Sequence, residues 1–318
     1  MGETDRIPVL VYDDGTRNGL KAMDRALAVA SRVVLAVSHE SENHPRNVTA
    51  ADDAGIQVVV ERLTAHTGVR HALRLCVDHE VFVAFVPTVT DETDDLVRKI
   101  VQAAAESEHD GLPVLAVQIV HPEAPSFGPV VEIDPAHADS GFTALFAAGL
   151  AASTRLPLHI VRLAGDRTHA DVRATEALHR ARQLIADSDI AVLDDTTDGD
   201  PIETALEHAA GASAVVVGLG GFDVEGRKLL SPGELPNAVM QTPDGRIARE
   251  LVRHANTDVV IVLDAIDSHG GRGARVAAVT AAVAAVTAAT HVAGLAGLAA
   301  SGGAVAVAAA GYRSTRHT

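Results

Sequence analysis

The segment DGDPIETALEHAAGASAVVVGLGG, residues 198–221, shows the order of secondary structure that recurs along the chain. Its first part predicts a helix near 201–210, and the apolar run SAVVVG (213–218) predicts a strand. Gly218 and Gly221 follow, and glycines at that point are typical of a turn. A continuous apolar run suits a strand that is covered on both faces, as in a parallel sheet. The segment therefore indicates an α/β fold.

The same alternation continues on both sides of this segment. Besides 213–218, apolar runs predict strands at IPVLVY (7–12), VVLAV (33–37), QVVVE (57–61), VFVAFV (81–86), PVLAVQI (113–119), VVEID (130–134), PLHIVRL (157–163), IAVLD (190–194) and DVVIVLD (258–264). Helical spacing predicts further helices near 18–30, 66–78, 92–107, 139–153, 168–187 and 245–255. This alternation is typical of doubly wound, mainly parallel sheets.

The order of elements runs through the chain twice. Setting VLVYD (9–13) over VVEID (130–134) gives an offset of 134 − 13 = 121 residues. At that offset Ala26 falls on Ala147, on the same predicted helical face. We interpret this as a tandem duplication, with three prolines marking HPEAPSFGP (121–129) as a linker. The predicted domains are 1–120 and 128–268, each with a five-stranded sheet, followed by an Ala-rich tail at 274–312.

Composition limits the classes of function. The chain has 318 residues, which suits two domains, and 47% of them are hydrophobic, so a packed core is expected. A formal net charge of −16 argues against a nucleic-acid partner, because binding a phosphate backbone needs a basic face. The single cysteine, Cys76, excludes an internal disulfide and is interpreted as a small buried hydrophobe.

The sequence contains no familiar catalytic or metal-binding spacing. The histidines form no H-E-x-x-H pattern, Lys228 does not complete a Walker loop, and no G-x-S-x-G motif is present. We therefore expect neither a metal site nor catalysis, although weak intrinsic nucleotide hydrolysis stays open.

The second copy resembles the universal stress protein family. Residues 198–221 are similar to the family stretch in which a helix precedes the fourth strand and that strand ends in a glycine turn. GRIARELVRHANTDVVIVLD (245–264) is similar to the family's last helix and strand. The resemblance extends over about 128–264 and is weak over 7–119. It implies a flavodoxin-like, doubly wound fold in each copy.

The resemblance also implies a nucleotide site. Nucleotide-binding members of the family carry the pattern G-x2-G-x9-G-[ST], whose backbone wraps the phosphates, and an aspartate at the end of the first strand that contacts the nucleoside. Gly218 and Gly221 match the first two glycines, and Asp134 matches the aspartate. The resemblance therefore implies ATP or a related adenine nucleotide as the ligand. The competing interpretation is that the glycines form a plain turn and that Asp134 caps one.

The third glycine of the pattern is displaced. The next candidate, Gly245, follows 245 − 221 − 1 = 23 intervening residues instead of nine, because of an insertion at 222–244. Arg246 stands where the pattern has Ser or Thr. Arg246 or Arg249, near a helix start, could replace the lost hydroxyl with a charge-assisted contact, or could be solvated surface residues.

The first copy lacks the glycine turn. Its corresponding segment is PTVTDET (87–93), in which the β-branched residues disfavour the close backbone approach that glycine permits. Asp13 matches the first-strand aspartate. We expect the first copy to hold no nucleotide.

Three functional hypotheses remain at this point. The first is a stress-protein-like sensor or adaptor that binds an adenine nucleotide in its second copy. The second is a scaffold without nucleotide, whose two copies pair with each other and which could be tethered to a membrane and regulate a membrane partner. The third is an enzyme of the wider adenine-nucleotide α-hydrolase group, disfavoured because no catalytic constellation is seen. Because members of the family commonly dimerise, we expect an intramolecular pseudo-dimer that joins the last strands or adjoining helices.

The tail has two interpretations. Residues 276–311 carry no formal charge apart from His291. This segment is longer than the roughly twenty residues that cross a bilayer. A transmembrane helix over 276–300 would tether the protein to a membrane. Alternatively, an Ala-rich helix uses its Val seam to pair with a copy of itself or to cover a sheet face. The N-terminus shows no signal peptide, so we expect a cytoplasmic main body.

Overall fold

A computed structural model describes most of the chain. The described residues are 7–39, 41–64, 68–88, 93–110, 116–125, 127–134, 141–163, 190–197, 199–219 and 234–263. The first half, residues 7–120, contains β1 (Ile7–Asp13), α1 (Arg17–Leu27), β2 (Ala30–Val37), α2 (His44–Asp53), β3 (Gln57–Arg62), α3 (Val69–Asp78), β4 (Val83–Pro87), α4 (Thr93–Asp110) and β5 (Ala116–Val120). The second half, residues 130–262, contains β6 (Val130–Asp134), α5 (Gly141–Thr154), β7 (Leu158–Leu163), β8 (Val192–Thr197), α7 (Pro201–Ala209), β9 (Ala214–Gly218), α9 (Leu235–Gln241), α10 (Pro243–His254) and β10 (Asp258–Val262).

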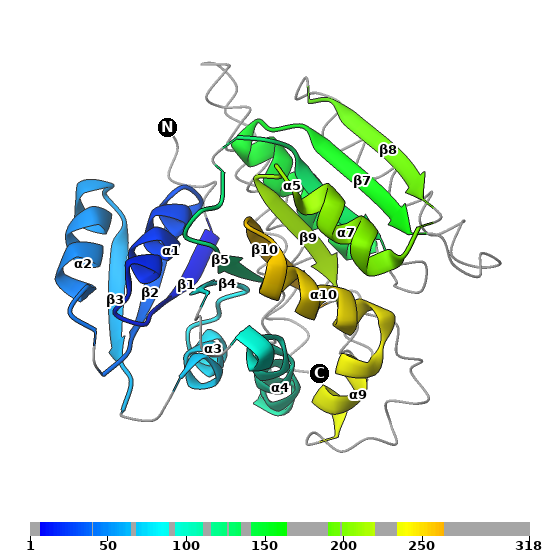
Figure 1. The fold of residues 1–318 in the computed structure, drawn as a ribbon. Helices are drawn as coiled ribbons and strands as arrows, with labels where there is room; N and C mark the ends of the chain where they lie inside the picture. The colour runs from blue at the N-terminus through cyan, green and yellow to red at the C-terminus, as the bar shows by residue number, and fades with distance from the viewer. Residues whose placement is uncertain are drawn as a thin grey trace, which may run out of the picture.

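The described strands form one continuous sheet. Its ten strands follow the order β3-β2-β1-β4-β5-β10-β9-β6-β7-β8. Each half has the same order when it is followed from its outer edge to the centre, and every neighbouring pair within a half runs parallel. At the centre β5 pairs antiparallel with β10, and Val260 lies opposite Gln118. In Figure 1 the blue-to-cyan half and the green-to-gold half meet along these two strands.

The α/β fold class and most element positions agree with the sequence prediction, with four corrections. The two predicted sheets are one, because the last strands of the halves pair. Helix α2 was not predicted, since His44–Asp53 buries only Asn47 and Ala51. The strand predicted at 190–194 is β8, Val192–Thr197, a mostly exposed edge strand with a polar end. The last helix begins at Pro243, two residues before Gly245, and part of the predicted insertion forms α9.

Two predicted segments fall outside the described residues: the helix near 168–187 and the tail at 274–312. Within the ranges given above, no helix combines the length and apolar character that a membrane crossing requires.

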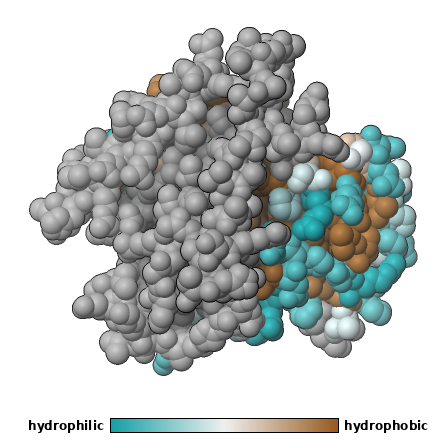
Figure 2. Space-filling model, turned by 180° about the vertical axis from the view of Figure 1, so that it is seen from behind, coloured by the Kyte–Doolittle hydropathy of each residue, from teal (hydrophilic) through white to brown (hydrophobic). Residues whose placement is uncertain are grey.

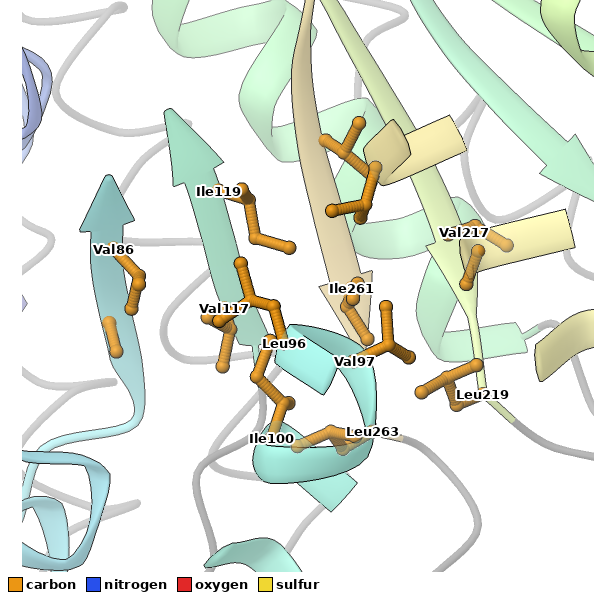
Figure 3. Close-up of a cluster of buried hydrophobic side chains, with 14 of the residues drawn as sticks. Val86, Leu96, Val97, Ile100, Val117, Ile119, Val217, Leu219, Ile261 and Leu263 are labelled. Atoms are coloured by element: carbon orange, nitrogen blue, oxygen red, sulfur yellow. The ribbon is translucent and has the colours of Figure 1, made fainter. Parts of the chain in front are cut away.

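One hydrophobic cluster spans both halves on one face of the sheet. Helices α3, α4, α7, α9 and α10 cover this face, and α4 of the first half packs against α9 and α10 of the second. The labelled side chains of Figure 3 come from both halves and are Val86, Leu96, Val97, Ile100, Val117, Ile119, Val217, Leu219, Ile261 and Leu263. Cys76 is fully buried in this cluster, as predicted, and burial raises the pKa of its thiol. We refer to this cluster as the shared core.

The opposite face has two separate clusters. Helix α1 packs over the first half-sheet, and α5 packs over the second. Figure 2 shows the molecule from behind, where the described surface mixes hydrophobic and hydrophilic residues beside the grey part. The shared core therefore joins the halves on one face, while the other face has two clusters, one under α1 and one under α5, with Phe146 packed against both.

Candidate functional site

The strand order reverses at one point in each half. This point lies between β1 and β4 in the first half and between β6 and β9 in the second. Parallel sheets leave a crevice there, beyond the carboxyl ends of the strands, where α/β proteins bind their ligands. In the second half Ile133 pairs with Val217, so Asp134 and Gly218 end neighbouring strands at the same edge. The structure thus brings together two of the residues predicted for the site.

Gly218 has a packing role of its own. A Cβ atom at this position would lie 2.4 Å from Thr143 Oγ1 on α5, which is too close for a real contact. A larger residue would force the Thr143 side chain to move, so substitutions here disturb the packing against α5 as well as a binding site. The close approach of Thr143 is therefore a sufficient reason for glycine at position 218, even if no phosphate binds there.

Buried polar atoms gather near Asp134 on the α5 side of the sheet. Glu132 lies two residues before Asp134, on the same face of β6, and Arg162 of β7 stands opposite Asp134 in the strand register. Both carboxylate oxygens of Glu132, Arg162 Nε and Thr143 Oγ1 are buried and have no hydrogen-bond partner. Arg162 does form an ion pair with Asp194 of β8 through its Nη2 atom. Because buried polar groups are nearly always paired, this cluster has unmet hydrogen-bonding capacity.

The electrostatics of Glu132 follow from its surroundings. Burial raises the pKa of its carboxyl well above the ordinary value of 4.5, and the Asp134 and Asp194 carboxylates raise it further, while Arg162 opposes them. The protonation equilibrium of Glu132 is therefore shifted toward the neutral, protonated carboxyl group. A neutral carboxyl can donate a hydrogen bond as well as accept one.

The matching position in the first half is internally satisfied. Asp13 is fully buried, and its Oδ1 accepts from the Gly15 N–H at 3.0 Å. Its Oδ2 accepts from Asn47 Nδ2 at 2.9 Å, and Asn43 Nδ2 donates to the Thr16 carbonyl at 2.7 Å. Asn47 lies on α2, which sequence reasoning did not find, and Asn43 is the N-cap residue of that helix. The first-strand carboxylate here is engaged by the protein itself.

The predicted residues of α10 are arranged around a helix cap. Thr242 Oγ1 accepts from the Gly245 N–H at 3.1 Å, and the Thr242 carbonyl accepts from the Arg246 N–H at 3.1 Å. A Cβ on Gly245 would lie 2.1 Å from the Val239 carbonyl oxygen, so α9 passes directly against this turn. Arg246 is exposed, and Arg249 Nε bonds to Glu250 at 3.1 Å.

The α10 residues do not join the cluster at Asp134. In the described part of the chain, Gly245, Arg246 and Arg249 form no hydrogen bond or ion pair with Asp134 or Gly218. Gly221, the remaining predicted site residue, lies outside the described residues. Across those same ranges, no group of three or more His, Cys, Asp or Glu side chains is arranged to hold a metal ion.

Sequence reasoning missed three members of the cluster. A charged residue inside the apolar strand VVEID was a usable signal for Glu132, because carboxylates are rarely buried unless they are paired. Arg162 had a similar signal within PLHIVRL. Thr143 had none, because only the fold brings it against Gly218.

Comparisons with known proteins give the fold. No family model matches the chain, and no curated protein matches it in sequence. Among solved structures, a functionally unknown protein from Pseudomonas aeruginosa PAO1 matches at 14% identity and a TM-score of 0.54, covering 91% of this chain and 98% of that one. A candidate universal stress protein from Pseudomonas aeruginosa UCBPP-PA14 matches at 14% identity and a TM-score of 0.55, covering 91% and 99%.

A third solved structure supports the same assignment of fold. A universal stress protein from Archaeoglobus fulgidus DSM 4304 matches at 14% identity and a TM-score of 0.51, covering 82% of this chain and 98% of that one. These likenesses show that the chain has the fold of the universal stress proteins.

Proposed function

We propose that the protein is a universal-stress-type sensor or adaptor that binds one adenine nucleotide, such as ATP, in its second half. The proposed site lies beyond the carboxyl ends of β6 and β9, where Asp134 and Gly218 end neighbouring strands. The observation that carries the proposal is the cluster of unpaired buried polar atoms of Glu132, Thr143 and Arg162 beside Asp134. A polar ligand would supply the missing hydrogen bonds. The corresponding aspartate of the first half, Asp13, accepts hydrogen bonds from Gly15 and Asn47 of the protein itself.

The phosphate end of this site differs from the family pattern. The first N–H groups of α10 already bond to Thr242, so they are not poised to cradle a phosphate. Arg246 is the exposed cation at this helix start and is the side chain we assign to a phosphate contact. We propose that binding is the activity of this site, since the sequence contains none of the catalytic motifs considered above.

Isothermal titration calorimetry of the full-length chain with ATP tests the proposal. Asp134→Asn should weaken ATP binding roughly tenfold or more, because it replaces a charged hydrogen-bond acceptor with a neutral one. The matched control is Asp13→Asn, the same change at the corresponding position of the first half. It should leave ATP affinity unchanged. Equal losses in both variants, or no loss in either, would contradict the site.

A scaffold without nucleotide is the second candidate. It is favoured by the turn at Gly245, where the backbone of Val239 occupies the space beside the start of α10. Under this hypothesis the protein releases no small molecule on denaturation, and ATP gives no heat of binding. Mass spectrometry of the supernatant from heat-denatured, freshly purified protein separates the two candidates. Adenine nucleotide at a stoichiometric level supports the first, and its absence together with silent calorimetry supports the second.

A further inference from the structure

A cavity of about 310 Å³ lies between α1 and α5, on the face of the sheet that these two helices cover. Its floor comes from the amino-terminal parts of β1, β4, β6, β9 and β10 together with the middle of β5, and α1 and α5 form its walls. The two separate hydrophobic clusters of this face flank it. The cavity thus occupies the gap that remains because each half has a covering helix of its own.

The two walls correspond to each other under the predicted tandem repeat. At the offset of 121 residues, Arg25 of α1 corresponds to Phe146 of α5, since 25 + 121 = 146. The same offset places Ala28 on Gly149 and Val29 on Leu150. All six residues line the cavity. It therefore lies where two equivalent helices face each other, but with a cation on one wall and an aromatic ring on the other.

The polar end of the cavity is built around Asp258. Arg25 Nε lies 3.1 Å from Asp258 Oδ2, and the Arg25 side chain is 35% exposed while that of Asp258 is 2% exposed. Gln118 Nε2 donates to the same oxygen at 2.8 Å, and the His121 N–H donates to Oδ1 at 3.0 Å. Both Asp258 oxygens are thus engaged, and the charge of Arg25 is already balanced.

The remaining polar atoms define what a ligand could meet. The Nη groups of Arg25 can still donate and Oε1 of Gln118 can still accept, since the described hydrogen bonds of these residues use only Arg25 Nε and Gln118 Nε2. The rest of the lining is mainly apolar, with Phe85, Phe146, Leu150 and Leu156 prominent. A mainly apolar cavity with a few convergent polar groups is the usual form of a small-molecule site.

We propose that this junction cavity binds a small, uncharged, mainly apolar molecule that carries one hydroxyl or carbonyl group. The apolar body contacts Phe85, Phe146 and Leu150, and the polar group bonds to Arg25 or Gln118. A carboxylate ligand would add a negative charge beside Asp258 in a chain whose net charge is −16. An ammonium ligand would face Arg25 while both Asp258 oxygens are occupied. A neutral ligand meets neither obstacle.

The test is a ¹⁹F NMR titration of the full-length chain with three probes of one size: 4-fluorobenzyl alcohol, 4-fluorobenzoate and 4-fluorobenzylamine. The alcohol should bind in the micromolar to millimolar range, and each charged probe about fivefold or more weakly. Equal binding of all three probes, or no binding of the alcohol, overturns the proposal. ATP should not displace the alcohol, and the alcohol should not change the affinity for ATP. A failure of the cavity proposal can therefore be told apart from a failure of the nucleotide proposal.

Two variants locate the binding. Ala28→Leu adds an apolar side chain at the exposed rim of the cavity, and Gly149→Leu adds one from α5, where leucine also favours the helix. Either should weaken binding of 4-fluorobenzyl alcohol about tenfold. The matched control is Ala50→Leu on α2, away from the cavity, which should leave binding unchanged. Unchanged affinity in both Ala28→Leu and Gly149→Leu rejects the small-molecule assignment. So does a concentration-dependent dimer that excludes the alcohol from the cavity and is lost in Ala28→Leu.

Discussion

Glu132 places a carboxyl group in the interior of β6, with neither oxygen hydrogen-bonded in the described structure. Burial is the first cause that raises its pKa above 4.5, and the neighbouring Asp134 is the second. A raised pKa in an acid means that the folded protein holds the proton over a pH range in which the unfolded chain has lost it. The stability that this group contributes is therefore complete below about pH 4.5 and is lost as the pH rises through the raised pKa.

Glu132→Gln should remove this pH dependence, because the amide stays neutral. We expect the unfolding free energy of the unchanged protein, relative to Glu132→Gln, to fall as the pH rises from about 4 to about 9. Urea denaturation at a series of pH values measures this difference in unfolding free energy. The control for the chemical change is Glu203→Gln, at an exposed position. A constant difference between the two proteins over this range contradicts a buried, neutral Glu132.

Asp258 ties the two halves together at the residue scale. It accepts hydrogen bonds from Gln118 and His121 and pairs with Arg25, all three of which belong to the first half or its linker. Asp258→Ala should lower the unfolding free energy by roughly 2–4 kcal/mol, because it leaves the buried Gln118 amide and the His121 N–H without their acceptor. Chemical denaturation measures the loss. The exposed Asp24→Ala on α1 is the control, and an equal, small effect of both changes would show that the contacts contribute little.

At the scale of elements, α4 and its partners hold the halves together on one face. Ile100 is fully buried on α4, in the shared core that also includes residues of α9 and α10. Ile100→Ala should destabilise the protein by about 2–5 kcal/mol, since it leaves a cavity in a packed core. The control is Val60→Ala on the edge strand β3, where the side chain is 39% exposed. A loss at Ile100 no larger than that at Val60 would indicate a loosely packed junction.

The elements also show what the sequence could predict. Nine strands were predicted from their apolar runs. Most of them are buried, as a central position in a parallel sheet requires, whereas β3 is an exposed edge strand whose run of three valines still gave the signal. Edge strand β8 was displaced because its exposed residues carry no such run. Helix α2 was missed because it buries an asparagine where an apolar residue is expected. Local pattern reports runs and periodic spacing of apolar residues, so elements without either, such as α2 and the polar end of β8, were missed or displaced.

The candidate site was predictable only in part, for a related reason. Asp134 and Gly218 each follow a recognisable strand, so their meeting at one edge follows from the parallel order. Thr143 reaches Gly218 through the packing of α5, and no local pattern reports such a contact. The α9 turn against Gly245 arises within the insertion, whose conformation the family pattern does not describe.

At the scale of the whole molecule, the continuous sheet predicts cooperative unfolding. The halves share the β5–β10 pairing, the shared core and the Asp258 contacts. Differential scanning calorimetry should therefore give one transition, with calorimetric and van't Hoff enthalpies that agree within about a fifth. Two resolved transitions would show that the halves unfold independently and that the pairing at the centre contributes little.

The central proposal is that the second half alone binds a nucleotide. Asp13 accepts hydrogen bonds from Gly15 and Asn47, whereas buried atoms of Glu132, Thr143 and Arg162 beside Asp134 have no hydrogen-bond partner. Native mass spectrometry of the full-length chain with excess ATP measures this difference directly, as the number of nucleotides bound per chain. The account predicts one nucleotide per chain, lost in Asp134→Asn and retained in Asp13→Asn. Two nucleotides per chain, or none, would contradict it.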